Sequence, residues 1–157
     1  MFNFYHAYLA IQHPNATLRY FLRRIITPPL LGYQQRVRTY LSELHTKKEF
    51  LNSLDRKLRS VGFETRVIKT RQAELYAIVR LLKPNIIVET GVENGISASF
   101  ILQALKDNNY GKLYSIEITQ ILANGREAGW IIPSDLKSRW ELLIGNSLEV
   151  LPILCRS

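Results

Sequence analysis

The sequence predicts an α/β fold in which an α-helical N-terminal region precedes a partial parallel sheet of about three strands. Up to residue 84, apolar residues recur at intervals of three, four and seven, which is the period of helices packed on one side. From Asn85 onward, short apolar runs rich in β-branched residues alternate with helical segments. That order is typical of parallel strands joined by right-handed crossovers.

Four helical segments are expected before the first strand. They span residues 1–13, 17–27, 34–61 and 70–82, with an extended connector over 63–69. Gly62 and Pro84 follow the last two helices, because glycine readily forms a left-handed cap and proline pushes the preceding residue out of the α region. The apolar residues expected on the buried face of the last helix are Leu75, Ile78, Val79 and Leu82.

Three strands are expected after the helical region, over Ile86–Glu89, Leu113–Glu117 and Trp140–Ile144. Each is a short run bounded by turn-forming residues. A helix over 97–106 separates the first two strands, and a short helix begins at Ser134 before the third. The side chains expected to face inward from the first of these helices are Phe100, Ile101 and Leu105.

Charge is distributed unevenly along the chain. Residues 1–84 hold 15 Lys and Arg against 5 Asp and Glu, whereas residues 85–157 hold 6 against 8. Together with the change from helices to alternating strands and helices, this favours two domains: a basic helical region over 1–69 and a Rossmann-like half-domain over 70–157. A basic region of this kind could bind a membrane surface or a polyanion, which would make the chain a non-catalytic module. A solvated helical surface is the simpler interpretation, because the charges are spread over several helices.

Residues with special backbone or charge follow each expected strand. Gly91 and Gly95 lie in the loop after the first strand, Glu117 ends the second, and Asn146 follows the third. Ligands of open parallel sheets bind beyond the carboxyl ends of the strands, so we expect these residues to surround one site. The helix that begins near Ser97 would direct the positive end of its dipole toward the same site.

The spacing within this set favours a nucleotide-type cofactor. Glycines let the backbone approach a ligand closely. Glu117 follows Gly95 by 22 positions, close to the roughly 20 expected between a glycine loop and the acid that binds a ribose diol. A purely structural turn and an NAD-type nucleotide binder are the alternatives. The second is less favoured because the G-x-G-x-x-G pattern is absent.

Three segments together resemble the class I S-adenosylmethionine-dependent methyltransferases. They are VETGVENGISASFIL (88–102), KLYSIEI (112–118) and GWIIPSDLKSRWELLIGNSLEVLP (129–152), within a resemblance that covers about residues 70–154. The resemblance implies S-adenosylmethionine as the cofactor. It implies these cofactor-binding residues: Glu89, Gly91 and Gly95 on the methionine side, Glu117 on the ribose hydroxyls and Asn146 near the adenine. Ser97 is a further candidate because of its place at the start of the helix.

Two positions depart from the pattern of that family. Glu93 stands where a middle glycine is usual, and Asn146 stands where an aspartate is usual. An asparagine oxygen can still accept a hydrogen bond from the adenine amino group, but without a charge.

The expected sheet is also shorter than the seven strands of the family. The later strands of the family carry the acceptor site, so the chain is interpreted as a truncated form with no identifiable catalytic residue and an unknown acceptor, a small molecule or a glycan. The free edge of the first strand would favour self-association.

Composition excludes several other classes of protein. With 46% hydrophobic and 22% charged residues, the chain is typical of soluble globular proteins. Cys155 is a lone cysteine, and His6, His13 and His45 have no metal-ligand spacing, so neither a disulfide nor a metal site is expected. No apolar run approaches the roughly 20 residues of a membrane span, and no signal sequence is evident. We therefore expect a cytoplasmic protein without a specific nucleic-acid signal.

Overall fold

The computed structural model describes residues 30–62 and 70–154. The predicted helices over 1–13 and 17–27, the connector over 63–69 and the lone Cys155 lie outside the described residues. In the described part of the chain, no helix is both long enough and apolar enough to cross a membrane.

A three-stranded parallel sheet forms the centre of the fold and confirms the predicted strands. The strands are β1 (Ile86–Thr90), β2 (Lys112–Glu117) and β3 (Trp140–Ile144), in the order β1-β2-β3. The register pairs Ile86 with Lys112 and Leu113 with Trp140. The three carboxyl ends therefore lie at the same edge of the sheet, as the sequence predicts.

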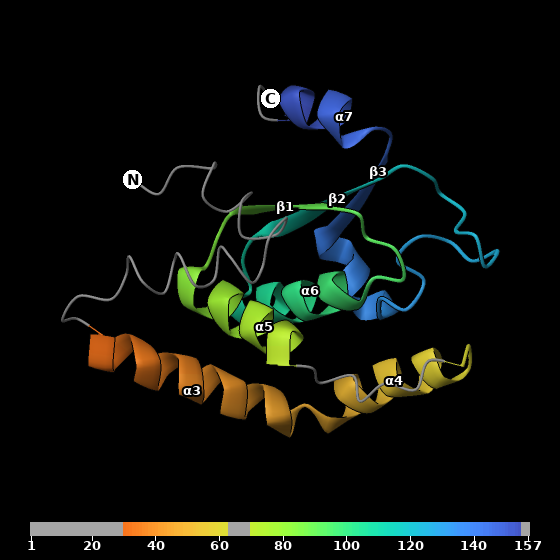
Figure 1. Ribbon diagram of the computed structural model, residues 1–157. Helices are drawn as coiled ribbons and strands as arrows, with labels where there is room; N and C mark the ends of the chain where they lie inside the picture. Colours follow the sequence, from red (N-terminus) through yellow and green to blue (C-terminus); the bar gives the residue numbers. More distant parts are fainter. Residues whose placement is uncertain (1–29, 63–69, 155–157) are drawn as a thin grey trace.

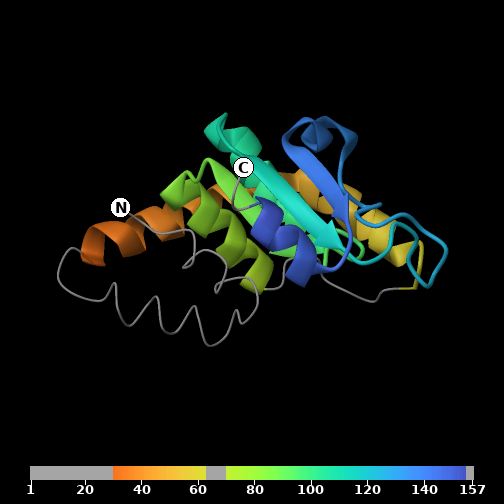
Figure 2. The same cartoon turned by 90° about the horizontal axis from the view of Figure 1, so that it is seen from above.

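Helices cover one face of this sheet in two layers (Figure 1). The first layer contains α5 (Thr70–Leu82), α6 (Ile96–Asn108) and the short 3₁₀ helix η1 (Ser134–Arg139), and the second contains α3 (Leu30–Thr46) and α4 (Lys48–Arg59). A further helix, α7 (Ser147–Leu154), lies on the opposite side of the sheet. Figure 2 looks onto this side, so that the strands of the sheet lie in front of the helical layers. The result is a partial Rossmann-like α/β fold preceded by helices.

The helix α6 is the most deeply buried element. All of its residues from Ala98 to Leu105 are buried, and they include the predicted inward residues Phe100, Ile101 and Leu105. Phe100 also meets Phe50 of α4 edge to face, with ring centroids 5.4 Å apart. This burial on every side follows from the position of α6 between the sheet and the outer helices, so its apolar residues need no single-sided pattern.

The long helix predicted over 34–61 is wrong as a single element. The structure has two helices, α3 and α4, that meet at Lys47, whose backbone (φ −81°, ψ 57°) is not helical. The Lys47 N–H donates to the Leu44 carbonyl at 3.0 Å, which closes the last turn of α3. The ammonium of Lys47 donates to Asp107 of α6 at 3.0 Å. The break thus occurs where the connecting residue bonds to a neighbouring helix.

The buried face predicted for α5 is shifted by about one position. Its buried residues are Ala73, Tyr76, Ala77 and Val79. Of the four predicted residues, Val79 is buried, Leu75 and Ile78 are half-buried, and Leu82 is exposed. The cause is polar: the hydroxyl of Tyr76 lies 2.8 Å from a Glu43 carboxylate oxygen and 2.7 Å from an Asp107 carboxylate oxygen. These bonds turn the face of α5 that bears Tyr76 toward α3 and α6.

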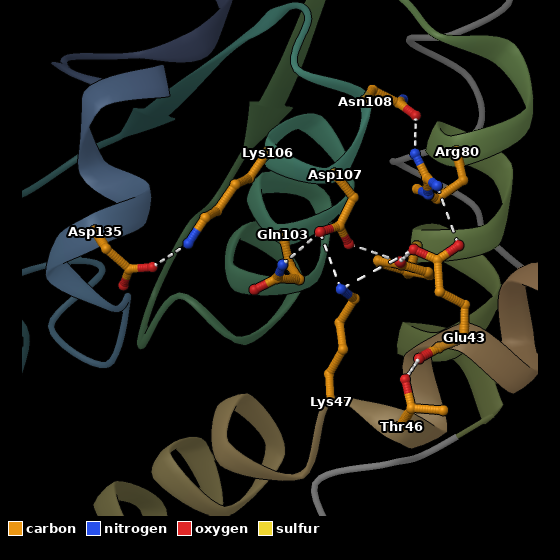
Figure 3. Close-up of polar contacts among 10 residues, drawn as sticks. Glu43, Thr46, Lys47, Arg80, Gln103, Lys106, Asp107, Asn108 and Asp135 are labelled. Atoms are coloured by element: carbon orange, nitrogen blue, oxygen red, sulfur yellow. Dashed lines mark hydrogen bonds and ion pairs between the residues drawn. The ribbon is translucent and has the colours of Figure 1, made fainter.

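Charged side chains between α3, α5 and α6 form an interhelical network (Figure 3). Arg80 bonds to Glu43 at 3.0 Å and also to Asn108, and Lys47 bonds to Asp107. Each carboxylate in the network has a cation as partner, so its charge is compensated although it is partly removed from water. The single Tyr76 hydroxyl is within hydrogen-bond distance of both carboxylates and can donate to one of them at a time. Figure 3 also shows a separate surface pair, Lys106 with Asp135 of η1 at 2.7 Å.

The helices α3 and α4 contribute to the same hydrophobic core as the sheet. Leu44 of α3 and three leucines of α4, namely Leu51, Leu54 and Leu58, belong to one cluster with residues of α5, α6 and the strands. The division into domains at residues 69 and 70 stays a prediction.

We expect Tyr76→Phe to destabilise the protein. The substitution removes the hydroxyl that bonds to Glu43 and Asp107, and it leaves the ring in its buried position. Loss of a hydrogen bond to a charged group costs about 1.5–3 kcal/mol. Urea unfolding would measure the change, with Tyr110→Phe, at a 49% exposed position, as the control. An unchanged midpoint for Tyr76→Phe would show that the network contributes no net stability.

Candidate functional site

The ends of the three strands are joined by backbone hydrogen bonds. The Gly91 N–H donates to the carbonyl of Ile116 at 2.8 Å, and the Gly145 N–H donates to the carbonyl of Glu117 at 2.8 Å. The loop after β1, the end of β2 and the turn after β3 are therefore adjacent. The structure brings together the elements that the sequence predicts to share one site.

The loop over residues 91–95, called the glycine loop below, contains three residues with positive φ. They are Gly91 (77°), Glu93 (47°) and Gly95 (91°). Gly91 is exposed, and a Cβ at this position would meet no atom within 4 Å. At Gly95 a Cβ would lie 2.9 Å from both the Cα of Gly129 and the Cγ1 of Ile132. The two glycines thus differ: Gly91 leaves open space at the sheet edge, and Gly95 allows close packing.

Both oxygens of the Glu117 carboxylate accept backbone hydrogen bonds. One accepts from the N–H of Glu93 at 2.9 Å, and the other accepts from the N–H of Ile118 at 2.9 Å. The side chain is only half-buried. Because a carboxylate offers about four lone-pair positions, it can accept further hydrogen bonds from a ligand. Glu117 is thereby fixed in orientation and still capable of binding hydroxyl groups.

Glu89 is a buried carboxyl group with two hydroxyl donors. Its side chain accepts hydrogen bonds from Ser97 of α6 and from Ser115 of β2, the second at 2.9 Å. The indole of Trp140 in turn donates to Ser115 at 2.9 Å. Burial raises the pKa of Glu89; the two serine hydroxyls act in the opposite direction, and the nearby charge of Glu117 adds to the rise. Glu89 therefore joins β1, β2 and α6 below the glycine loop.

The N-terminus of α6 points to this edge of the sheet. Its N-cap residue is Gly95, which has no side chain to satisfy the first N–H groups of the helix. The hydroxyl of Ser97 bonds to Glu89, so this serine connects the helix to β1. An anionic group at this end would be stabilised by the free N–H groups and the helix dipole.

Asn146 is exposed and directly precedes α7. Its side-chain oxygen accepts a hydrogen bond from the N–H of Leu148 at 3.0 Å, which is the geometry of a helix cap. Asn146 directly follows Gly145, which bonds to Glu117, so it lies beside the other site residues. The helix α7 that it caps was not expected from the sequence.

Asn94 and Trp130 are part of the site's surroundings and were not predicted. The indole N–H of Trp130 donates to the side-chain oxygen of Asn94 at 2.7 Å. The N–H of Gly129 also donates to the carbonyl of Glu93, at 2.7 Å. The chain between β2 and η1 thus returns to the glycine loop. Residue spacing carries no signal for this return, because the intervening segment has no regular period.

No group of three or more His, Cys, Asp or Glu side chains in the described ranges is arranged to hold a metal ion.

Part of the chain is similar to a known family. Residues 88–156 match the family model described as a methyltransferase domain. The match begins within β1 and includes the glycine loop, Glu117 and Asn146. The match supports a methyltransferase domain in this part of the chain. A search of curated proteins and a search of solved structures each found no match.

The pH dependence of stability should reveal the burial of Glu89. Because its pKa is raised by the fold, its favourable contribution is fully present below the unfolded value near 4.5 and is lost as pH rises through the folded pKa. We expect the stability of Glu89→Gln relative to the wild type to increase as the pH rises above about 4.5, because only the wild type must then ionise a buried carboxyl group. Urea unfolding at several pH values would measure this difference. Glu141→Gln, which removes an exposed carboxylate of β3, is the control for loss of one charge, and a difference that falls with rising pH would contradict the prediction.

Substitution of the two loop glycines by alanine should destabilise the protein to different extents. Gly91→Ala adds a methyl group in open space and costs only the strain of a left-handed backbone, about 1–2 kcal/mol. Gly95→Ala adds a clash with Gly129 and Ile132 to the same strain. Thermal unfolding should therefore show a clearly larger loss for Gly95→Ala. Equal losses would mean that the packing at Gly95 relaxes without cost.

Proposed function

We propose that the chain binds S-adenosylmethionine at the carboxyl edge of the sheet, as part of an enzyme that transfers the methyl group to an acceptor. The main support is the position of Glu117. Its carboxylate lies at the end of β2, bonds to the glycine loop and keeps free lone pairs, within a segment that matches a methyltransferase domain. Such a carboxylate is suited to the two hydroxyls of a ribose.

The other residues have complementary roles in this proposal. Gly91 leaves the backbone accessible, and the start of α6 at Ser97 offers N–H groups to the carboxylate of the methionine portion. Glu89 bonds to Ser97 and Ser115, and Gly95 packs against Gly129 and Ile132, so both stabilise this region. Asn146 would lie near the adenine. The cofactor supplies a methyl group on a positively charged sulfonium, and the chain's residues bind and orient it.

Charge favours this cofactor over an NAD-type nucleotide. Glu93 and Glu117 place two carboxyl groups at the glycine loop, and the N–H of Glu93 already bonds to Glu117. A pyrophosphate would meet these carboxylates and would find that N–H occupied, whereas a sulfonium cation is attracted by negative charge. The sequence departure at Glu93 thus supports a cationic ligand.

The alternative of a module that binds a membrane or a polyanion through basic helices has less support. The basic segment over 17–27 lies outside the described residues. Of the described basic side chains, several are held by carboxylates, as in Lys47–Asp107 and Arg80–Glu43. An acceptor of small-molecule or glycan type, a cytoplasmic location and self-association stay predictions.

Substitution of Glu117 tests the proposed cofactor site. We expect the wild type to bind S-adenosylhomocysteine in a calorimetric titration, and we expect Glu117→Ala to weaken binding by at least about 10-fold. The reason is that a hydrogen bond to a charged group contributes about 1.5–3 kcal/mol.

Glu141→Ala, in the exposed part of β3, is the matched control and should bind like the wild type. A folded wild type that gives no heat with S-adenosylhomocysteine would refute the proposal. Heat with NADH instead would favour the nucleotide alternative.

A further inference from the structure

We infer that Asn94 and Trp130 are positioning residues that hold the glycine loop in the conformation that receives the adenosyl group. The inference rests on the proposed function and concerns how its site is built. The segment 128–132, which contains Trp130, is called the brace below. It follows β2 in the chain and contacts the loop after β1, which contains Asn94.

Asn94 is the centre of this arrangement. Only 4% of its surface is exposed, although it lies in a loop. Its side-chain oxygen accepts the Trp130 indole N–H at 2.7 Å, and its amide donates to the carboxylate of Glu93 at 3.1 Å. One buried amide therefore bonds to both the indole of Trp130 and the side chain of Glu93.

Backbone bonds from the brace hold the same part of the loop. The N–H of Gly129 donates to the carbonyl of Glu93 at 2.7 Å, and the N–H of Ile131 donates to the carbonyl of Asn94 at 3.2 Å. Two successive peptide groups of the loop thus have fixed orientations. This matters because Glu93 has a φ of 47°, a conformation that residues other than glycine rarely adopt.

Close packing fills the space between the brace and the loop. A Cβ at Gly129 would lie 2.5 Å from the ring of Trp140, and a Cβ at Gly95 would lie 2.9 Å from the Cα of Gly129. Ile131 and Ile132 are 0% and 1% exposed. The brace is therefore held by the core and cannot move independently of the loop.

The face of Trp130 is covered by a cation. The guanidinium of Arg126 lies 4.3 Å from the centroid of the indole ring, within the range of a cation–π contact. Arg126 also ends a tight turn, in which the Leu122 N–H donates to the Arg126 carbonyl at 2.8 Å. The indole is thus oriented by Arg126 on its face and by Asn94 at its N–H.

The orientation of the Glu93 N–H depends on the conformation of the glycine loop. This group donates to Glu117 at 2.9 Å only while the loop keeps its left-handed geometry at Glu93. The brace therefore acts on the proposed ribose-binding carboxylate through the loop, without contacting Glu117 itself. We expect loss of the Asn94–Trp130 bond to weaken cofactor binding while the fold remains.

A double-mutant cycle on the full chain tests the inference. Asn94→Ala and Trp130→Phe each remove the same hydrogen bond, and Phe keeps an aromatic ring below Arg126. Calorimetric titration with S-adenosylhomocysteine should show each single variant weakened by about 10-fold. Asn94→Ala also removes the bond to Glu93. The double variant should therefore be about as weak as Asn94→Ala alone, because the bond that the two residues share can be lost only once.

Tyr76→Phe is the matched control, because it removes buried hydrogen bonds in the interhelical network and leaves the loop unchanged. Its affinity for S-adenosylhomocysteine should stay within about 2-fold of that of the wild type, even if its stability falls as much as that of the Asn94 and Trp130 variants. Affinities of the Asn94 and Trp130 variants equal to that of the wild type would overturn the inference. So would equal weakening in Tyr76→Phe.

Hydrogen exchange without ligand separates this inference from the proposed function. Amides of residues 91–97 should exchange faster in Asn94→Ala and Trp130→Phe than in Tyr76→Phe. A folded wild type that does not bind S-adenosylhomocysteine would refute the cofactor assignment. Unchanged exchange in the Asn94 and Trp130 variants would refute the role of these residues in holding the loop, whatever the cofactor.

Discussion

The carboxylate of Glu117 connects the parts of this structure on which the site depends. By accepting the N–H groups of Glu93 and Ile118, it fixes the loop after β1 against the end of β2. The backbone carbonyl of Glu117 accepts a hydrogen bond from the Gly145 N–H, which joins the turn after β3 to the end of β2. A charged acceptor for backbone N–H groups is stronger than a neutral one. The carboxyl edge of the sheet therefore has one defined arrangement rather than three independent loops.

The helical layers support this edge from a distance. The helix α6 carries Ser97 in its first turn and is buried from Ala98 to Leu105, so its position is set by the sheet on one side and by α3, α4 and α5 on the other. Near its C-terminal end, Asp107 bonds to Lys47 and Tyr76 in the interhelical network. The first half of the chain thus packs against the helix whose N-terminus lies at the site, and its polar network joins the opposite end of that helix. This dependence is consistent with one core that includes residues of both halves.

The departures from the sequence predictions share one physical origin. Apolar periodicity predicts the existence of helices, and the helices over 34–61 and 70–82 are present. It does not predict that Lys47 interrupts the first of them, because the partner that favours the break, Asp107, lies 60 positions away. The buried face of α5 differs from the prediction for the same reason, because Tyr76 is buried and its two carboxylate partners come from α3 and α6.

The sequence by itself determined the three strands, the intervening helix, the glycine loop and the acidic residue at the end of β2. These features depend on local patterns, namely the alternation of short apolar runs with helical segments and the placement of glycine and glutamate at strand ends. Only the tertiary structure decided that Gly95 is a packing residue, that Glu93 bonds to Glu117, and that Trp130 reaches back to Asn94. Each of these contacts joins residues 24 to 37 positions apart, and such contacts form only when the sheet and its connections have brought those residues together.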